Sequence, residues 1–207
     1  MNTNVLRNLS YGLYVVSSLD GDRLTGCTAN SVIQINSSPN TVMASINRDN
    51  FTNKCIKETG KFAVSILSEK SDPSIIGNFG FQSGKDVNKF ENVKYELKEG
   101  LPVVLDSCGY IVAKVIDKME TSTHTIFLGE IIDCDVLENE NPMTYAYYHK
   151  EVKGKSSTVI NKESTEGHKL NKYMCTVCGY IYEGEYLPDD FICPICKQGA
   201  DKFKQIE

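Results

Sequence analysis

The stretch YGLYVVSSLDGDRLTGCTA, residues 11–29, indicates how the larger part of this chain folds. An apolar run leads into Asp20-Gly21, and a second run of strand-forming residues follows. Asp-Gly between two such runs is typical of a tight β-hairpin, because these residues tolerate the positive φ that the turn requires. The stretch therefore predicts two antiparallel strands joined at Asp20-Gly21.

Outward from this hairpin, the sequence alternates between strand and helix patterns. Four further segments have the composition of strands: residues 41–47, 61–67, 107–120 and 124–137. NFTNKCIKETG, residues 50–60, predicts a helix that ends at Gly60. SDPSIIGNFGF, residues 71–81, predicts a second helix with Ser71 or Asp72 as its cap and Pro73 in its first turn. Many strands with few helices predict a mainly β fold, a barrel, over residues 1–150.

Composition excludes several classes of protein. The chain has 207 residues, 41% of them hydrophobic, and a net charge of −5. An acidic chain without a basic face is not expected to bind nucleic acid. The sequence contains no apolar run long enough to span a membrane, and its first residues lack the pattern of a secretion signal. We therefore expect a cytoplasmic protein with no membrane partner.

Beyond the barrel the composition changes. Residues 151–171 are rich in Lys, Ser, Thr, Glu and Gly, which is typical of a flexible linker. Residues 172–207 are too few to fold on a hydrophobic core alone, so a metal or disulfides are expected to stabilise them.

The eight cysteines fall into two groups. Cys27, Cys55, Cys108 and Cys134 are scattered, and we expect each of them to be a small buried side chain. The other four form two Cys-x-x-Cys pairs: Cys175, Cys178, Cys193 and Cys196. Two such pairs facing each other give four sulfurs in a tetrahedron, which suits zinc or iron. The spacing predicts a metal site and leaves the choice of metal open.

The residues around these pairs favour iron. Aromatic side chains flank both pairs, and such a shell controls solvent access and tunes a redox potential. YMCTVCGYIY, LPDDFICPIC and ADKF, within residues 173–203, resemble rubredoxin, and the short stretch between the pairs is similar to the rubredoxin-type tail of rubrerythrins. The resemblance implies that the four clustered cysteines hold one iron atom that carries single electrons.

In the barrel, local patterns alone leave the chemistry open. The polar loops TGCTANSV (25–32) and SINRDNFTNK (45–54) suit an anionic or flat ligand, but they are also compatible with ordinary surface loops. His124 and His149 are candidate acid–base groups or structural histidines. Five segments, however, resemble the flavin reductase-like, FMN-binding split-barrel family in sequence order: YGLYVVSS with TGCTANS, TVMASINRDNFT, GKFAVSILSE, IGNFGFQSGKDVNKFENV and THTIFLGEI.

This resemblance implies a role for each matched position. The isoalloxazine edge would be lined by Thr28, Ala29, Asn30 and Ser31. The other side of the ring or the ribityl chain would contact Ser45, Ile46 and Asn47. The phosphate would be held by Asn50, Phe51 and Thr52, with help from Lys85 or Lys89. His124 would lie beside the nicotinamide or the flavin, as a catalytic group.

Together the two resemblances predict an NAD(P)H-dependent oxidoreductase. FMN would take electrons from NAD(P)H and pass them to the iron of the same chain, and a flavodiiron protein that reduces oxygen or nitric oxide would be the acceptor. The resemblance also implies a homodimer. Two alternatives remain: a reductase that releases reduced flavin, and a flavin-binding barrel with a zinc ribbon as a docking module.

Overall fold

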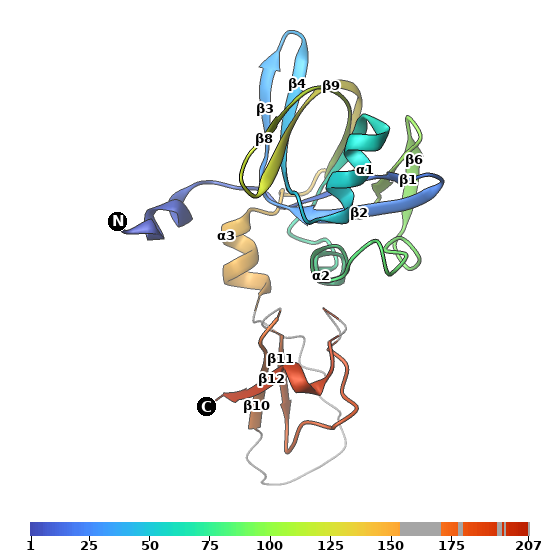
Figure 1. The fold of residues 1–207 in the computed structure, drawn as a ribbon. Coiled ribbons are helices and arrows are strands. Elements are labelled where there is room, and N and C mark those ends of the chain that lie inside the picture. The colour runs from blue at the N-terminus through green and yellow to red at the C-terminus, as the bar shows by residue number, and fades with distance from the viewer. Residues whose placement is uncertain (154–170, 178–179, 194–195, 197, 207) are drawn as a thin grey trace.

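The computed structural model describes residues 1–153, 171–177, 180–193, 196 and 198–206. A seven-stranded antiparallel sheet in the order β2-β1-β5-β8-β9-β4-β3 curls into a barrel (Figure 1). Its strands are β1 (Tyr14–Asp20), β2 (Arg23–Ala29), β3 (Val32–Ser37), β4 (Asn40–Asn47), β5 (Lys61–Ile66), β8 (Gly109–Glu120) and β9 (His124–Val136). The predicted mainly β barrel is therefore confirmed.

The β1–β2 hairpin forms as predicted, but its turn lies one residue later. Asp20 pairs with Arg23, so the two loop residues are Gly21 and Asp22. Gly21 has a φ of 60°, a conformation that glycine adopts without strain. The side chain of Asp20 instead forms an ion pair with Arg23 across the turn, at 3.0 Å.

Both predicted helices are present, with the predicted caps. Helix α1 (Phe51–Thr59) begins after Asn50, whose side chain accepts a hydrogen bond from the Thr52 amide, and it ends at Gly60 with a φ of 65°. Helix α2 (Pro73–Phe81) is capped by Asp72. Ser71, the other candidate cap, is buried and donates its hydroxyl to the Asp106 carbonyl instead.

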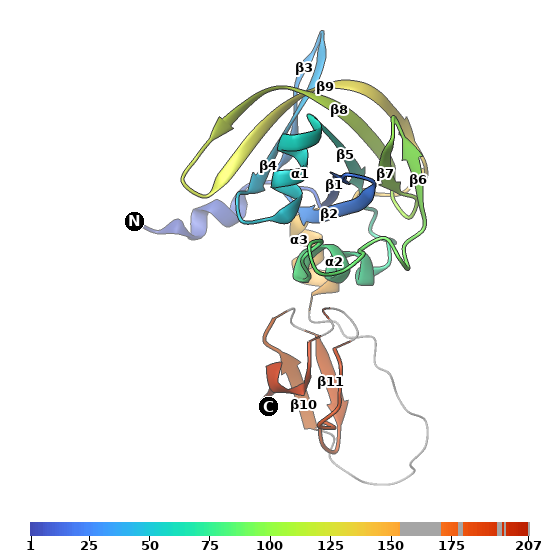
Figure 2. The same ribbon diagram turned by 45° about the vertical axis from the view of Figure 1, so that its right-hand side comes forward.

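The barrel interior is packed with side chains from every part of the sheet. Val16, Ile46, Phe62 and Phe127 are among the buried residues that form one apolar cluster, and Ile56 of α1 joins them. A second cluster lies under α2, where Phe79 packs edge-on against Phe90 with ring centroids 4.9 Å apart. The two helices thus cover different faces of the barrel wall, as Figure 2 shows.

Several elements have no counterpart in the expectations from sequence. Strand β3 is an edge strand with exposed Ile33 and Ile35, and the hairpin of β6 (Tyr95–Lys98) and β7 (Leu101–Val104) packs beside β1 and β5. The remaining helical turns are η1 (Thr3–Asn8), α3 (Tyr145–Tyr147) and the π-helix η2 (Tyr148–Val152).

The small C-terminal domain is a three-stranded sheet in the order β11-β10-β12. Its elements are β10 (Asn171–Cys175), β11 (Ile181–Gly184), η3 (Ala200–Lys202) and β12 (Phe203–Ile206). Both views show it beyond α2 and α3, at the opposite end of the molecule from the β3–β4 hairpin (Figures 1 and 2).

Most of the predicted linker, 151–171, lies outside the described residues. None of the helices in the described part of the chain has the length and apolar content needed to cross a membrane.

The scattered cysteines differ from one another in burial. Cys27 and Cys55 are buried, as expected, and burial raises the pKa of the Cys55 thiol to about 11. Cys108 is only half-buried, and Cys134 is exposed. The expectation is therefore wrong for Cys134, because it lies near the end of β9, beyond the part of the strand that covers the barrel interior.

Candidate functional site

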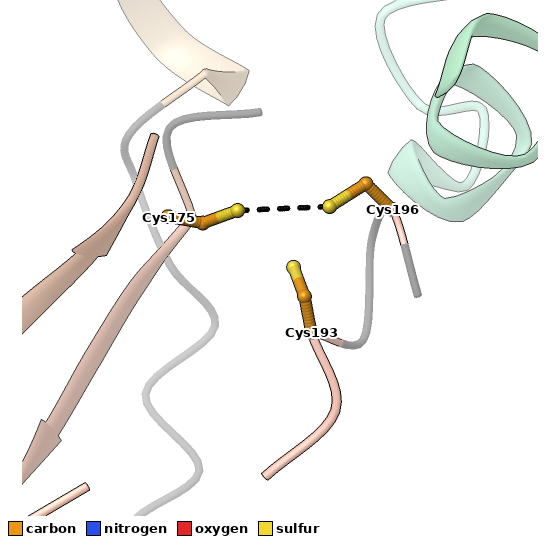
Figure 3. Close-up of side chains that lie close together, drawn as sticks. All are labelled: Cys175, Cys193 and Cys196. Carbon is orange, nitrogen blue, oxygen red and sulfur yellow. Dashed lines mark hydrogen bonds between the residues drawn. The ribbon is translucent and has the colours of Figure 1, made fainter. Parts of the chain in front are cut away.

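Three of the four clustered cysteines converge on one point. The Sγ atoms of Cys175, Cys193 and Cys196 all lie within 4.8 Å of one another, and those of Cys175 and Cys196 are 3.6 Å apart (Figure 3). Thiolates that share a metal at the usual bond length of about 2.3 Å, in a tetrahedron, lie about 3.8 Å apart. The three thiols are buried, and their arrangement fits a tetrahedral metal site. Cys178, the fourth predicted ligand, lies outside the described residues.

Backbone hydrogen bonds fix the positions of Cys175 and Cys193. The Cys175 amide donates to the Tyr180 carbonyl at 2.7 Å, and the Cys193 amide donates to the Gln198 carbonyl at 2.8 Å. Cys175 ends strand β10, which pairs with both neighbouring strands of the small sheet. The sheet therefore fixes the position of Cys175, and the hydrogen bond to Gln198 fixes that of Cys193.

Aromatic rings form the expected apolar shell around the thiols. Phe191 is central to this shell: its ring centroid lies 4.6 Å from that of Tyr182 and 5.3 Å from that of Phe203. Tyr180 is buried in the same cluster. One further aromatic residue, Phe81, comes from the end of α2 in the barrel and packs against the thiol cluster. No local pattern indicates this contact, because the two segments lie far apart along the chain.

Strand pairing brings several of the predicted barrel residues onto one face. Asn47 pairs with His124, and Ser45 pairs with Ile126, so the side chains at these positions point to the same side of the sheet. The Ser45 amide also donates to the Ser31 carbonyl at 2.9 Å. Small polar side chains and a histidine from distant parts of the sequence thus share the outer face of the sheet.

The other predicted residues of these strands have different surroundings. Ile46 points into the barrel core and is 2% exposed, so it offers a ligand only its backbone. Ala29 also packs against the core. The Thr28 hydroxyl donates to the Ile76 carbonyl of α2 at 3.2 Å, while Asn30 accepts a hydrogen bond from the neighbouring Ser31 hydroxyl.

Two cationic side chains lie against the first residue of α1, although each also forms an ion pair, Arg23 with Asp20 and Lys54 with Glu58. The guanidinium of Arg23 lies 5.3 Å from the centroid of the Phe51 ring, and the ammonium of Lys54 lies 5.8 Å from it. Arg23 also donates to the Lys85 carbonyl, which brings the loop after α2 to the same place. Cations beside a helix N-terminus suit a phosphate group. Arg23 was not among the predicted site residues, because only the tertiary fold brings it next to Phe51.

A buried hydroxyl near this helix end has no hydrogen-bond partner. Thr25 Oγ1 is fully buried, and no donor or acceptor in the described part of the chain reaches it. It faces Gly84, where an added Cβ would lie 2.2 Å from the hydroxyl oxygen and 3.5 Å from the Phe51 ring. Glycine at this position lets the loop after α2 approach β2 closely.

Two residues predicted to hold phosphate have other partners. Thr52 is buried, and its amide is satisfied by the Asn50 side chain. The ammonium of Lys89 donates to the carbonyls of Gly26 and Phe79, at 3.0 and 2.9 Å, within the wall between β2 and α2. Burial lowers the pKa of Lys89 to about 8. A cavity of about 570 Å³ borders Lys89 and lies between α2 and residues 88–94.

His124 begins β9 at the rim of the sheet and is half-buried. Its Nδ1 atom lies 2.8 Å from the Thr123 hydroxyl, and its backbone amide donates a hydrogen bond to the Thr121 hydroxyl at 3.0 Å. A network of charged side chains lies beside it, in which Glu120 pairs with Lys57 at 2.7 Å and with Arg48 at 3.6 Å. Lys57 is the largest reason that the pKa of the Glu120 carboxyl is lowered.

Fold and site together define a two-domain metalloprotein, an antiparallel barrel followed by a thiolate metal domain. The chain belongs to the flavin reductase-like domain family, whose model matches residues 6–156, and it carries a rubrerythrin-type rubredoxin-like domain at residues 173–204. These memberships confirm the two resemblances and the expected cofactor classes, flavin and iron, and they make the chain an oxidoreductase.

Individual relatives agree with this assignment. The chain is 38% identical to a high molecular weight rubredoxin of Moorella thermoacetica, and the match covers 100% of both chains. It is also 38% identical to a ferric-chelate reductase (NAD(P)H) of Archaeoglobus fulgidus, over 75% of this chain and 94% of that protein. Among solved structures, an NADH:FAD oxidoreductase of Streptomyces globisporus superposes with a TM-score of 0.63 at 26% identity, covering 68% of this chain and 83% of its own.

Proposed function

We propose that this protein is an NAD(P)H-dependent oxidoreductase that reduces FMN in its barrel and passes the electrons to iron in its own C-terminal domain. The observation that carries the proposal is the convergence of Cys175, Cys193 and Cys196 in a buried aromatic shell that touches the barrel. The names of two relatives support the proposal. The high molecular weight rubredoxin supports iron as the electron carrier, and the ferric-chelate reductase (NAD(P)H) supports NAD(P)H as the electron donor.

The chemistry requires two different electron carriers. Bound flavin accepts two electrons as a hydride and releases them singly, and iron in four thiolates accepts one at a time. The protein's part is to hold the ring, the nicotinamide and the metal in place and to exclude water from the thiolates. The aromatic side chains of Tyr180, Phe191 and Phe203 perform the last task around the metal site.

The barrel residues divide into ring and phosphate contacts in this proposal. The ring lies on the outer face that carries Ser31, Ser45 and Asn47, with Thr28, Ala29, Asn30 and Ile46 contributing from the adjoining strand ends. The phosphate lies at the N-terminus of α1, near Asn50 and Phe51. Lys85, which is exposed, and Arg23 supply positive charge there. Lys89 already satisfies two carbonyls, so it holds the wall of the site together rather than the phosphate.

We expect His124 to act on the hydride-transfer step. It shares the outer face of the sheet with Asn47. The contact between its Nδ1 atom and the Thr123 hydroxyl, together with its backbone hydrogen bonds, holds the imidazole ring in one orientation at the rim of the sheet. His124→Ala should slow flavin reduction by NAD(P)H about a hundredfold, while FMN affinity changes less. The test is anaerobic stopped-flow reduction with a parallel FMN titration. An unchanged rate of flavin reduction would leave His124 with a structural role only.

A homodimer accounts for the apolar surface beside this face. Ile33 pairs with Met43, which pairs with Leu128, and these side chains lie on the same side of the sheet as Ser45. Exposed Met119 and Ile116 of β8 lie next to these side chains, and a group of exposed apolar residues is typical of an interaction surface. A second barrel covering it would place each ring site near the subunit boundary. Sedimentation of the flavin-loaded protein tests this, and a monomer with full flavin content would contradict it.

An external acceptor must collect the electrons from the metal site. Acidic side chains on the small domain, Glu185, Asp189 and Asp190, are exposed and suit a partner with a basic patch. We propose a flavodiiron protein as that acceptor. The domain boundaries of this scheme are residues 1–150 for the barrel, 151–171 for the linker and 172–207 for the metal domain, although η2 continues the barrel domain to Val152.

One experiment tests the route as a whole. The protein loaded with FMN and iron is mixed anaerobically with NADH or NADPH, and the flavin and iron absorbance bands are followed together. The flavin band should bleach first, and the iron band should follow it. If the flavin is reduced while the iron stays ferric, release of reduced flavin becomes the better account. Stoichiometric zinc in protein from an iron-replete host would instead favour a docking role for the small domain.

A further inference from the structure

An aromatic side chain of the barrel packs against the buried cluster of the metal domain. Phe81, the last residue of α2, is half-buried and packs against the cluster of Cys175, Tyr180, Cys193 and Cys196. Figure 3 shows a helix of the barrel beside Cys196, and Figures 1 and 2 both place the small domain next to α2. The contact is thus with the cluster that contains the three thiols.

The same end of α2 lies directly on strand β2, where the ring site begins. A Cβ added at Gly80 would lie 3.5 Å from Thr28 Oγ1, so no side chain separates the helix from Thr28. The Thr28 hydroxyl also donates to the Ile76 carbonyl one turn earlier. Two adjacent residues, Gly80 and Phe81, therefore contact the first predicted ring residue and the thiol cluster respectively.

We propose that the C-terminal end of α2 is the docking site of the metal domain and that Phe81 is the positioning residue through which it seats on the barrel. The proposal rests on the proposed function, since it describes how the two redox sites of that route meet. In the docked state the metal site faces the strand end at Thr28, and the route between the two sites passes along Gly80 and Phe81.

An external acceptor is needed to balance the electrons in this arrangement. One hydride brings two electrons to the flavin. Each docking event passes one of them to ferric iron, which becomes ferrous, and an external one-electron acceptor reoxidises it before the second transfer. The proton that the flavin held leaves to solvent. Docking must therefore be reversible, or the acceptor must reach the iron from the face that α2 leaves open.

The chain offers a direct spectroscopic test because it contains no tryptophan. Phe81→Trp introduces a single indole at the proposed contact, and Leu97→Trp places one on β6 as a control, at a position that is 57% exposed. Both variants are prepared with iron and with zinc, at equal flavin content. Iron should quench the emission of Phe81→Trp strongly relative to zinc and should quench Leu97→Trp much less. Equal quenching in the two variants would overturn the docking site. This test does not depend on whether NAD(P)H reduces the protein.

A kinetic test separates docking from the proposed function. Phe81→Ala should leave the rate of flavin reduction unchanged and slow iron reduction about tenfold, as expected for truncating an aromatic contact. Phe81→Leu should recover part of the loss, and Leu97→Ala should match the unaltered protein. The rate should not depend on protein concentration, because the contact lies within one chain.

The outcomes of this test are distinct. If iron in the unaltered protein is never reduced, the proposed function fails. If that iron is reduced and Phe81→Ala reduces it equally fast, the function stands and the docking site is wrong. A rate of iron reduction that rises with protein concentration would also overturn docking within the chain.

Discussion

The barrel and the C-terminal domain reach stability in different ways. In the barrel, Phe62, Val64 and Phe127 belong to a large interior of fully buried apolar side chains. In the described part of the small domain, the buried cluster consists of three thiols and Tyr180. A core of apolar side chains stabilises a fold without any cofactor. A cluster of thiols stabilises a fold only when it binds a metal. The two domains should therefore respond independently to changes in either core.

Removing one metal ligand should give the largest effect and should confine it to the small domain. Structural metals in small thiolate domains contribute on the order of 10 kcal/mol to folding. Cys193→Ser should therefore unfold residues 172–207 while the barrel keeps its thermal transition and its rate of flavin reduction. Heteronuclear NMR of the two sets of amide signals measures both responses in one sample.

Cys134→Ser is the matched control for that variant. Cys134 is exposed on β9 and lies outside the thiol cluster, so its replacement should leave the metal content and both sets of signals unchanged. Loss of the barrel transition in Cys193→Ser would show that the two domains fold as one unit.

Truncating a core residue of the barrel should give the complementary result. Phe127 is fully buried at the centre of the barrel interior, and Phe→Ala in a core typically costs about 3–5 kcal/mol. Phe127→Ala should lower the barrel transition by that free energy, as measured by urea denaturation, and leave the iron absorbance of the folded protein intact. Phe127→Leu should cost much less. If the iron spectrum is lost together with the barrel transition, the metal domain depends on docking for its stability.

Lys89 adds a dependence on pH that only the barrel should show. Its pKa is lowered by burial to about 8, from 10.5, so the unfolded chain binds its proton more readily than the folded chain does. Unfolding therefore takes up a proton between about pH 8 and pH 10.5, and this group makes the barrel more stable as pH rises through that window, by about 3 kcal/mol in all.

Lys89→Met tests this contribution to stability. The free energy of unfolding of the variant and of the unaltered protein is measured by denaturation at several pH values between about 8 and 10.5. The variant should be less stable than the unaltered protein at high pH, because the Gly26 and Phe79 carbonyls lose their donor. Its stability should also rise less with pH. Identical slopes for the two proteins would mean that Lys89 titrates normally in the fold.

Much of the fold was predictable, because the decisive signals are local. The cap at Asn50 and the left-handed Gly60 define α1 within a dozen residues, and the spacing of the cysteines predicts a metal site at which three of them meet. Strand β3 escaped prediction because its large apolar residues, Ile33 and Ile35, point outward from an edge strand. Strand β7 is only four residues long and contains Pro102, which a pattern of strand-forming residues does not suggest.

The site was less predictable, because it depends on contacts between distant segments. Strand register, which no local pattern reveals, sets Asn47 beside His124. The position of Arg23 over Phe51 and the contact of Phe81 with the thiol cluster arise only after the hairpin, α1 and α2 have packed. The family resemblance supplied His124 and the loops as candidates, and the fold shows which of their side chains reach a common surface.

The smallest expected effect concerns Asn50, where a structural role and a binding role coincide. As the cap of α1, its side chain accepts the Thr52 amide at 3.0 Å, so Asn50→Ala should cost the barrel about 1 kcal/mol. Asn50→Asp should keep the cap and hence the stability, because aspartate is an equally good capping residue.

Aspartate at position 50, however, places a negative charge where the phosphate of FMN is proposed to lie. If FMN binds there, Asn50→Asp should weaken FMN affinity more than Asn50→Ala does, although it is the more stable variant, and fluorescence titration beside urea denaturation measures both. Equal FMN affinities in the two variants would show that the phosphate does not lie beside the Asn50 side chain.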